Sequence, residues 1–279
     1  MVLDNLFKPV DAEKQPWQMF FLGILFSTIA MFVSYFIFKT QSSLIMVFLV
    51  VLLSFPIVYN TIKFEEQKDE LNLSEKTLLV EHSKALFVFM FLFLGIMLSL
   101  TLWYVLLPDS YTSFLFKSQI DTISSINGQI SGNAFHFDYF TNILLNNLRV
   151  LIICVLFSFI YGVGAMFILT WNATVIAAAI GTFIKKQLVN VTGYASSAGV
   201  INIVSIGISK YMVHGIFEIL SYFIAALAGG LISIAVIRHK VGTKAFKNIV
   251  FDVSELLVIS IAVLVFAAVI EVYVSYRVF

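Results

Sequence analysis

The stretch ALFVFMFLFLGIMLSLTLWYVLL, from Ala85 to Leu107, decides the fold of this chain. It contains no charged residue, and it is long enough to cross the ~30 Å hydrocarbon core of a bilayer as a helix, which takes about 20 apolar residues. Its apolar residues are continuous rather than alternating, which argues against the strands of a membrane barrel. Because a helix satisfies its own backbone hydrogen bonds in lipid, the stretch predicts a transmembrane helix.

The composition extends this prediction to the whole chain. Of its 279 residues, 60% are hydrophobic and 12% are charged, whereas a soluble domain carries about 25% charged residues. So few charges cannot cover a water-exposed surface of this size, and the 29 phenylalanines suit a surface that faces lipid. We therefore expect an all-α, polytopic helical protein of the cell membrane, with the lipid bilayer as its main partner.

The apolar runs predict about seven transmembrane helices. The runs of full length cover residues 19–38, 44–62, 85–107, 148–169, 216–237 and 256–274. Two runs in the second half, Ala173–Ile184 and Ile201–Ile208, are short for a complete span. We expect 173–184 to cross in a thinned or tilted way or to re-enter, and 201–208 to dip into the membrane and return.

Two polar segments divide the chain into an N-terminal three-span region (1–107), a loop (108–147) and a core with a C-terminal span (148–279). Residues 63–84 are the most charged stretch, and they predict a solvated cytoplasmic loop with short amphipathic helices. Segments 63–84 and 108–147 are both candidate docking surfaces for protein partners. Self-association into a homo-oligomer stays open.

Lysine and arginine predict the orientation, because they are enriched in cytoplasmic loops. The two most basic loops are 63–84 and 238–247, and the 108–147 loop contains only Lys117. A cytoplasmic N-terminus places both basic loops in the cytoplasm and the 108–147 loop outside. Lys39 and the Lys185–Lys186 pair oppose this orientation.

Several function classes are disfavoured by what the sequence lacks. The net charge is +1 and no basic patch is present, which argues against nucleic acid. Cys154 is the one cysteine, so neither an internal disulfide nor a zinc-binding cysteine spacing exists. No metalloprotease, serine hydrolase or phosphate-binding motif is found. We therefore expect no catalytic residue, no metal, no cofactor and no enzymatic activity.

Polar residues in or beside the apolar runs are candidates for an intramembrane polar site, because an ionisable group at membrane depth is costly. His214 and Glu218 are four residues apart and share a helix face. Their spacing matches two ligands of a zinc-protease motif, but only one is a histidine and no third ligand is evident. For Arg149 and Glu271 the alternative is snorkelling at the interface. The candidates are Asn146, Asn147, Arg149, Asn172, His214, Glu218 and Glu271.

Glycines in the second half predict close packing between helices, because small residues let helix backbones approach one another in lipid. Gly215 has an alternative role, since a glycine permits a local break at the start of a helix. The glycines expected at helix contacts are Gly162, Gly164, Gly181, Gly215, Gly229 and Gly230.

Several short motifs resemble one known family. They are Asn146-Asn147, Tyr161-Gly-Val-Gly-Ala, Thr170-Trp-Asn-Ala, His214-Gly-Ile-Phe-Glu218 and Ala228-Gly-Gly, with Pro16-Trp17-Gln-Met-Phe and Tyr59-Asn-Thr-Ile-Lys63 nearer the N-terminus. Together they resemble the stage II sporulation protein M family, in particular its archaeal branch. The family signature is Pro-His-Gly with a glutamate three residues later. Here Val213 replaces the proline, while His214, Gly215 and Glu218 remain.

The resemblance implies an integral membrane protein that is not itself a hydrolase. In spore-forming bacteria the namesake anchors and scaffolds cell-wall hydrolases during engulfment. A chain of the archaeal type has no such enzymes to recruit, so the family name does not define its task. The same match relates Asn172 to the asparagine of the family's central turn.

Three functions stay open. The first is a non-enzymatic scaffold that docks partners through its polar segments. The second is a transporter or channel-like protein, in which the two short apolar runs form broken helices around Asn172, His214 and Glu218. The third is an intramembrane enzyme that uses His214 and Glu218. A dry core favours the scaffold, and a water-lined cavity at Glu218 favours transport. The enzyme requires a nucleophile or metal within reach of His214, and its absence would exclude this function.

Replacing Glu218 with leucine should lower the stability of the folded protein. We expect the buried carboxylate to accept a hydrogen bond, and its removal leaves the donor unpaired at a cost of about 1–3 kcal/mol. Thermal melting in detergent should give a lower Tm for Glu218→Leu than for the unaltered chain. An unchanged Tm would refute this expectation.

Overall fold

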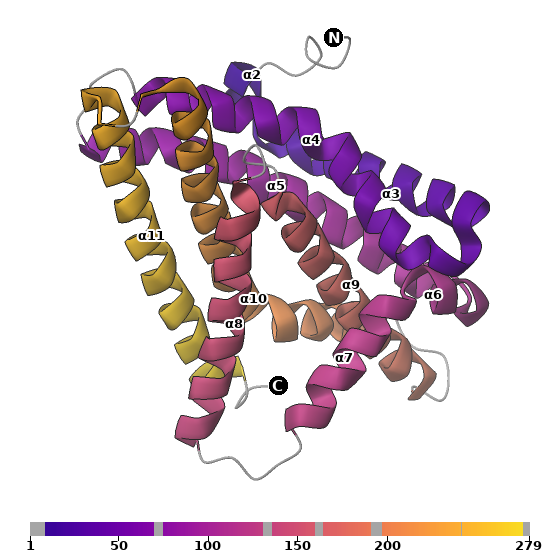
Figure 1. The fold of residues 1–279 in the computed structure, drawn as a ribbon. Coiled ribbons are helices and arrows are strands. Elements are labelled where there is room, and N and C mark those ends of the chain that lie inside the picture. The colour runs from indigo at the N-terminus through magenta and orange to yellow at the C-terminus, as the bar shows by residue number, and fades with distance from the viewer. Residues whose placement is uncertain are drawn as a thin grey trace.

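The structure is a computed structural model that describes residues 9–69, 75–130, 136–159, 164–190, 197–240 and 242–275. Within these residues the regular structure is all helix, as the composition predicts (Figure 1). The elements are α2 (Pro9–Lys14), α3 (Trp17–Phe38), η1 (Lys39–Gln41), α4 (Ser42–Asp69), α5 (Glu75–Leu106), α6 (Asp109–Leu115), α7 (Lys117–Ile130), α8 (His136–Ser158), α9 (Ala165–Asn190), α10 (Ser197–Arg238), α11 (Lys244–Ile270) and η2 (Glu271–Ser275).

In the described part of the chain, six continuous helical stretches are long and apolar enough to cross a membrane. The first of them, Trp17–Lys68, contains two helices, α3 and α4, which the short turn η1 joins into a hairpin. Figure 1 shows these two helices side by side. The expected number of about seven membrane helices agrees with this arrangement when the hairpin is taken as two crossings.

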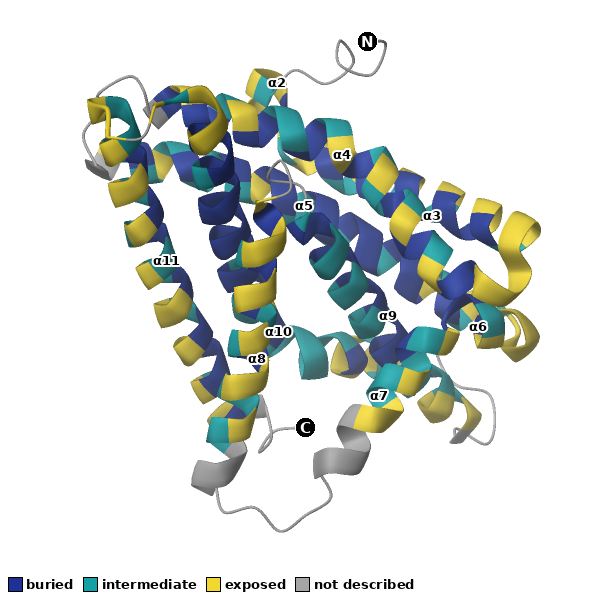
Figure 2. Ribbon diagram, viewed as in Figure 1, coloured by how far each residue is buried: buried dark blue, intermediate teal, exposed yellow. Residues whose placement is uncertain are grey.

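Helix α10 is the element around which the bundle packs. It contacts α4, α5, α8, α9 and α11. In Figure 1 the start of α10, here called its first leg and containing residues 201–208, lies across one end of the bundle, and the rest, its second leg containing residues 221–231, runs alongside α11. Every residue from Ser221 to Leu231 is buried in this second leg (Figure 2). Small and apolar side chains therefore fill the centre of the bundle.

The contact between α3 and α5 depends on two glycines. A Cβ on Gly23 would collide with the carbonyl oxygen of Leu92, and a Cβ on Gly95 would collide with the carbonyl oxygen of Phe20. Because these neighbours are backbone atoms, neither can move aside without displacing a helix. The backbones of α3 and α5 thus approach one another as closely as helices do at small residues in lipid.

The expected span Leu148–Leu169 is wrong as a single helix. α8 ends at Ser158 and α9 begins at Ala165, on either side of a stretch that contains Gly162 and Gly164. Gly164 lies in a turn directly before α9, and glycine disfavours a helix by about 1 kcal/mol relative to alanine, so continuous hydropathy did not guarantee a continuous helix.

The two short apolar runs are parts of longer helices. Ala173–Ile184 is the middle of α9, and Ile201–Ile208 lies in the first leg of α10. α9 continues past its apolar run because Lys185, the residue after that run, has hydrogen-bond and charge partners at the end of the bundle. The Lys185 ammonium donates to the carbonyl oxygen of Leu107 at 2.8 Å and pairs with Asp109 at 2.8 Å.

The charged stretch 63–84 is not a solvated loop where the structure describes it. α4 extends to Asp69 and α5 starts at Glu75. Glu65, Lys68 and His82 are buried within these helix ends. Composition alone predicts solvation for such a stretch. These charged side chains can be buried here because each of them faces a group of opposite charge.

Lys68 is the centre of this buried ionic network. Its ammonium lies 2.8 Å from a carboxylate oxygen of Glu13, 2.7 Å from one of Glu65 and 3.3 Å from one of Glu81. The second oxygen of Glu65 lies 2.8 Å from Nδ1 of His82. The network therefore joins the short helix α2 to the ends of α4 and α5.

A second ionic group fastens the end of α10 to α4. The buried carboxylate of Glu66 accepts from the guanidinium of Arg238, and its other oxygen lies 2.9 Å from Nε2 of His239. These contacts place α2, the end of α4, the start of α5 and the end of α10 at one end of the bundle. They agree with the prediction that both basic segments share one side of the membrane, while the identity of that side stays a prediction.

Gly95→Ala should destabilise the bundle at the α3–α5 contact. Overpacking costs about 1–3 kcal/mol, and here the added methyl group meets backbone on the facing helix. Melting in detergent should show a clear loss of Tm. Gly215→Ala is the matched control, because nothing lies within 4 Å of a Cβ at Gly215, and it should leave Tm unchanged or higher. Equal Tm values for the two variants would contradict the proposed contact.

The docking of α2 should weaken as pH rises. Burial raises the pKa of Glu13 to about 8, the neighbouring Glu65 adds to the increase, and Lys68 opposes it. The folded protein therefore keeps a proton that the unfolded chain releases above a pKa of 4.5. The resulting stability is complete below that value and is lost as pH rises through about 8.

The measurement is the Tm of the unaltered chain and of Glu13→Gln between pH 6 and pH 9. Glutamine mimics the protonated carboxyl group, so Glu13→Gln should lose less Tm over this range. Asp11→Asn on the exposed face of the same helix is the control, and it should follow the unaltered chain. The idea fails if Glu13→Gln and Asp11→Asn have the same pH profile.

Candidate functional site

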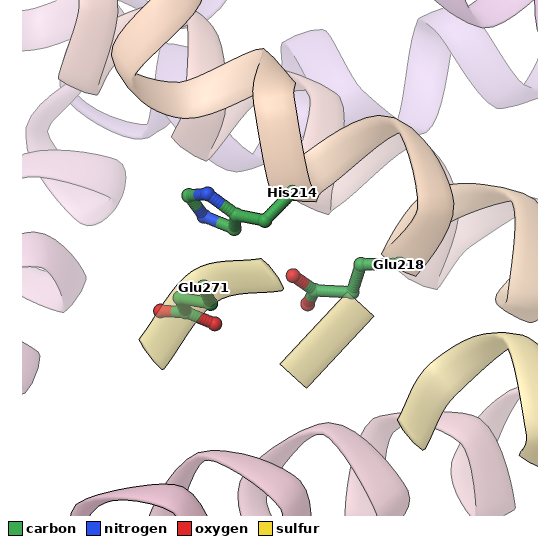
Figure 3. A group of neighbouring side chains, drawn as sticks. All are labelled: His214, Glu218 and Glu271. Atoms are coloured by element: carbon green, nitrogen blue, oxygen red, sulfur yellow. The ribbon is translucent and has the colours of Figure 1, made fainter. Parts of the chain in front are cut away.

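The structure brings together three of the polar residues that the sequence singles out. One donor atom each of His214, Glu218 and Glu271 lies within 4.8 Å of the other two. His214 and Glu218 come from α10, and Glu271 begins the turn η2 at the end of α11. Figure 3 shows the three side chains directed into the same space between these elements. All three are half-buried.

This cluster lies at one end of the membrane helices rather than at their middle. Glu218 precedes Arg238 by five to six helical turns, roughly 30 Å of helix. That length equals the thickness of a hydrocarbon core, about 30 Å. The cluster therefore lies about one hydrocarbon thickness along α10 from Arg238, the residue that ends this helix.

The orientation of Glu218 is set by the next turn of its own helix. The hydroxyl group of Tyr222 donates to Oε1 of Glu218 at 2.8 Å. Tyr222 is completely buried, so this bond satisfies a hydroxyl that has no access to water. It supplies the donor that the stability prediction for Glu218→Leu requires, and it leaves the second carboxylate oxygen of Glu218 for other partners.

Glu271 is held at a change of helical geometry. It is the C-cap of α11, directly after Ile270, and its backbone amide donates to the carbonyl oxygens of both Ala267 and Ala268. The following turn, Glu271–Ser275, has π-helical geometry. Turns of this kind are rare and often occur at functional sites. They re-aim a side chain relative to a regular helix, and here the side chain faces α10.

The remaining polar candidates lie elsewhere on the bundle. Asn147 is buried and accepts from the exposed Asn146 at 3.4 Å. Arg149 is exposed on α8, and its snorkelling at the interface stays a prediction. Asn172 donates to the carbonyl oxygen of Ile168 at 2.9 Å within α9, so this amide is used inside its own helix. The transport hypothesis grouped Asn172 with His214 and Glu218, but in the structure the third residue of the group is Glu271.

Some of the predicted packing glycines lie at close helix contacts, and others do not. A Cβ on Gly181 would collide with the ring of Tyr104, and a Cβ on Gly229 would collide with Ser158. Gly230 is buried beside Gly229, whereas Gly164 is half-buried in the turn before α9. Gly215 has open space around it, so it is not required by packing. Gly162 lies outside the described residues.

Two features of the site were missed by reasoning from the sequence. Tyr222 lies four residues after Glu218 on the same helix face, a spacing that could have identified it as a hydrogen-bond partner. Glu271 was found as a polar residue, but its pairing with α10 had no local signal because 53 residues separate it from Glu218. The third ligand-like group that the sequence lacked is thus supplied by a distant helix.

Chemically, the cluster can hold a cation or share protons. It offers an imidazole nitrogen and carboxylate oxygens. Neither glutamate pairs with a lysine or arginine in the part of the chain that the structure describes. Two carboxyl groups this close cannot both ionise cheaply unless something positive lies between them.

Comparison with known proteins identifies the family of the chain. A family model described as Stage II sporulation protein M matches residues 85–276, which include most of α5, all of α6 to α11 and all three residues of the cluster. No curated protein and no solved structure matches the chain.

Proposed function

The chain belongs to the stage II sporulation protein M family, and we propose that it acts in the cell membrane as a non-enzymatic scaffold that docks partner proteins. The N-terminus is assigned to the cytoplasm, because the two basic segments share its end of the bundle. α6, α7 and the start of α8 then face the outside.

The observation that carries this proposal is the filled centre of the bundle. From Phe223 to Leu231 every residue of α10 is buried, and all of them are apolar or glycine. A transport pathway needs polar side chains or unwound backbone at membrane depth. The second leg of α10 instead supplies a continuous helix of small and apolar residues, which suits a rigid framework.

A docking surface is available on α7. Lys117, Asp121 and Ser124 are exposed at positions i, i+4 and i+7, which lie on one helix face. The opposite face is anchored, since Gln119 donates to Thr174 of α9 at 3.1 Å and Ser118 lies 2.9 Å from Ser43 of α4. α7 is therefore a fixed helix with a free polar face. The segment 63–84 is less suitable, because its buried charges are paired within the bundle.

Transport is the second candidate, and the cluster of His214, Glu218 and Glu271 favours it. Ionisable residues within membrane spans are common on ion and proton pathways. The position of the cluster near one boundary provides an entrance, but the apolar stretch beyond Tyr222 offers no polar group to continue the path.

The scaffold is tested by exchanging the charges on the exposed face of α7. The double variant Lys117→Glu/Asp121→Lys preserves the net charge and keeps an i, i+4 ion pair, so folding and Tm should be unchanged. Proteins that co-purify with the unaltered chain from its native membranes should fall at least tenfold in yield. Lys186→Glu, an exposed change at the same end of the bundle, should retain them. Equal yields for all three chains would exclude docking by α7.

A flux assay separates the two candidates. Liposomes that contain the purified chain should pass protons, Na⁺ and Zn²⁺ at the rate of protein-free liposomes. Flux above that rate in the unaltered chain, lost in Glu218→Gln, would replace the scaffold by a transporter.

A further inference from the structure

The donor atoms at His214, Glu218 and Glu271 form a set that ordinary ion pairing does not explain. One imidazole and two carboxylates meet within 4.8 Å (Figure 3). Lipid-facing helices gain nothing from two neighbouring carboxylates, which repel one another in a medium of low dielectric constant. The arrangement has to be compensated by a positive charge between them or by bound protons.

The spacing of the first two donors is the spacing of metal ligands on a helix. Residues at i and i+4 present their side chains on one face, one turn apart. Two ligands at this spacing are how helical zinc motifs bind their ion, with the third ligand supplied by another element. His214 and Glu218 occupy these two positions, and Glu271 of η2 is the third.

The distances between the three donor atoms are somewhat longer than those around a bound metal ion. Around Zn²⁺, nitrogen and oxygen ligands lie at about 2.0–2.2 Å, which separates them from one another by about 3.4 Å in a tetrahedron. Donor atoms within 4.8 Å of one another are at most about 1.4 Å farther apart than that spacing.

The surroundings already orient two of the ligands. Tyr222 donates to Oε1 of Glu218, which is the kind of outer hydrogen bond that fixes a ligating carboxylate and leaves its other oxygen for the metal. The π-helical turn that begins at Glu271 directs that carboxylate toward α10. Both features are independent of the spacing between His214 and Glu218.

We infer that His214, Glu218 and Glu271 bind a divalent first-row transition-metal ion of the Zn²⁺ class. A mixed set of imidazole and carboxylate ligands suits such ions better than it suits Mg²⁺ or Ca²⁺, which prefer oxygen alone. Three protein ligands leave a fourth position for water or an external ligand. The ion joins the end of α11 to α10 near the membrane boundary, and the inference does not depend on the scaffold function.

The test uses the full chain, purified in detergent with its affinity tag removed and stripped with a chelator. Equilibrium dialysis against Zn²⁺, followed by metal analysis, should give one ion per chain at saturation. The Tm should rise with Zn²⁺ concentration, as binding to the folded state requires. Glu271→Gln and His214→Gln should each weaken binding at least tenfold and remove the rise in Tm.

Glu255→Gln is the matched control. Glu255 is half-buried on α11 about four turns before Glu271, and its replacement should leave both Zn²⁺ binding and the rise in Tm intact. The Tm of each variant without metal verifies that it is folded, so lost binding is not confused with lost structure.

Two results would overturn the inference. One is the absence of saturable Zn²⁺ binding by the unaltered chain, which would leave shared protons as the compensation for the carboxylates. The other is equal binding by Glu271→Gln and Glu255→Gln, which would place the ion elsewhere. Both results leave the docking experiment on α7 unaffected, so the scaffold and the metal site can fail separately.

Discussion

The constraint on which this structure depends is that a charge buried in an apolar bundle has to be compensated inside the protein. Solvent is absent, and an unpaired buried charge costs several kcal/mol. The two ends of α10 meet this constraint in different ways. At one end Glu65, Glu66 and Lys68 are completely or almost completely buried and are paired with groups on neighbouring elements. At the other end His214 faces two glutamates.

Between these ends the chain avoids charge altogether and relies on packing. Helices in lipid gain little from a hydrophobic effect between them, so close backbone approach provides the stabilisation. Gly23 and Gly95 allow it for α3 and α5, and Gly229 allows it for α8 and α10. The apolar centre is therefore a consequence of the same constraint, since any polar group placed there would need a partner that a closely packed helix contact has no room to provide.

The sequence predicted what depends on local composition and failed where distant residues decide. Long apolar runs identified the membrane helices, and the motif around His214 identified the family. The stretch 63–84 looked solvated because the partners of its charges are remote: Glu13 lies 55 residues before Lys68, and Arg238 lies 172 residues after Glu66. Glu271 looked like a snorkelling side chain for the same reason. A polar residue is predicted to be exposed as long as its partner is unknown. The partner is known only when the fold has brought distant residues together.

The two ends of α10 also differ in what they can do. At the end near Arg238 the carboxylates of Glu65 and Glu66 have cationic or imidazole partners within the protein. At the end near Glu218 two carboxylates lie beside one histidine, and neither carboxylate pairs with a lysine or arginine among the residues that the structure describes. α11 is largely exposed along its length and its strongest contact is with α10. An ion bound by Glu271 would therefore connect α11 to the helix that it contacts most.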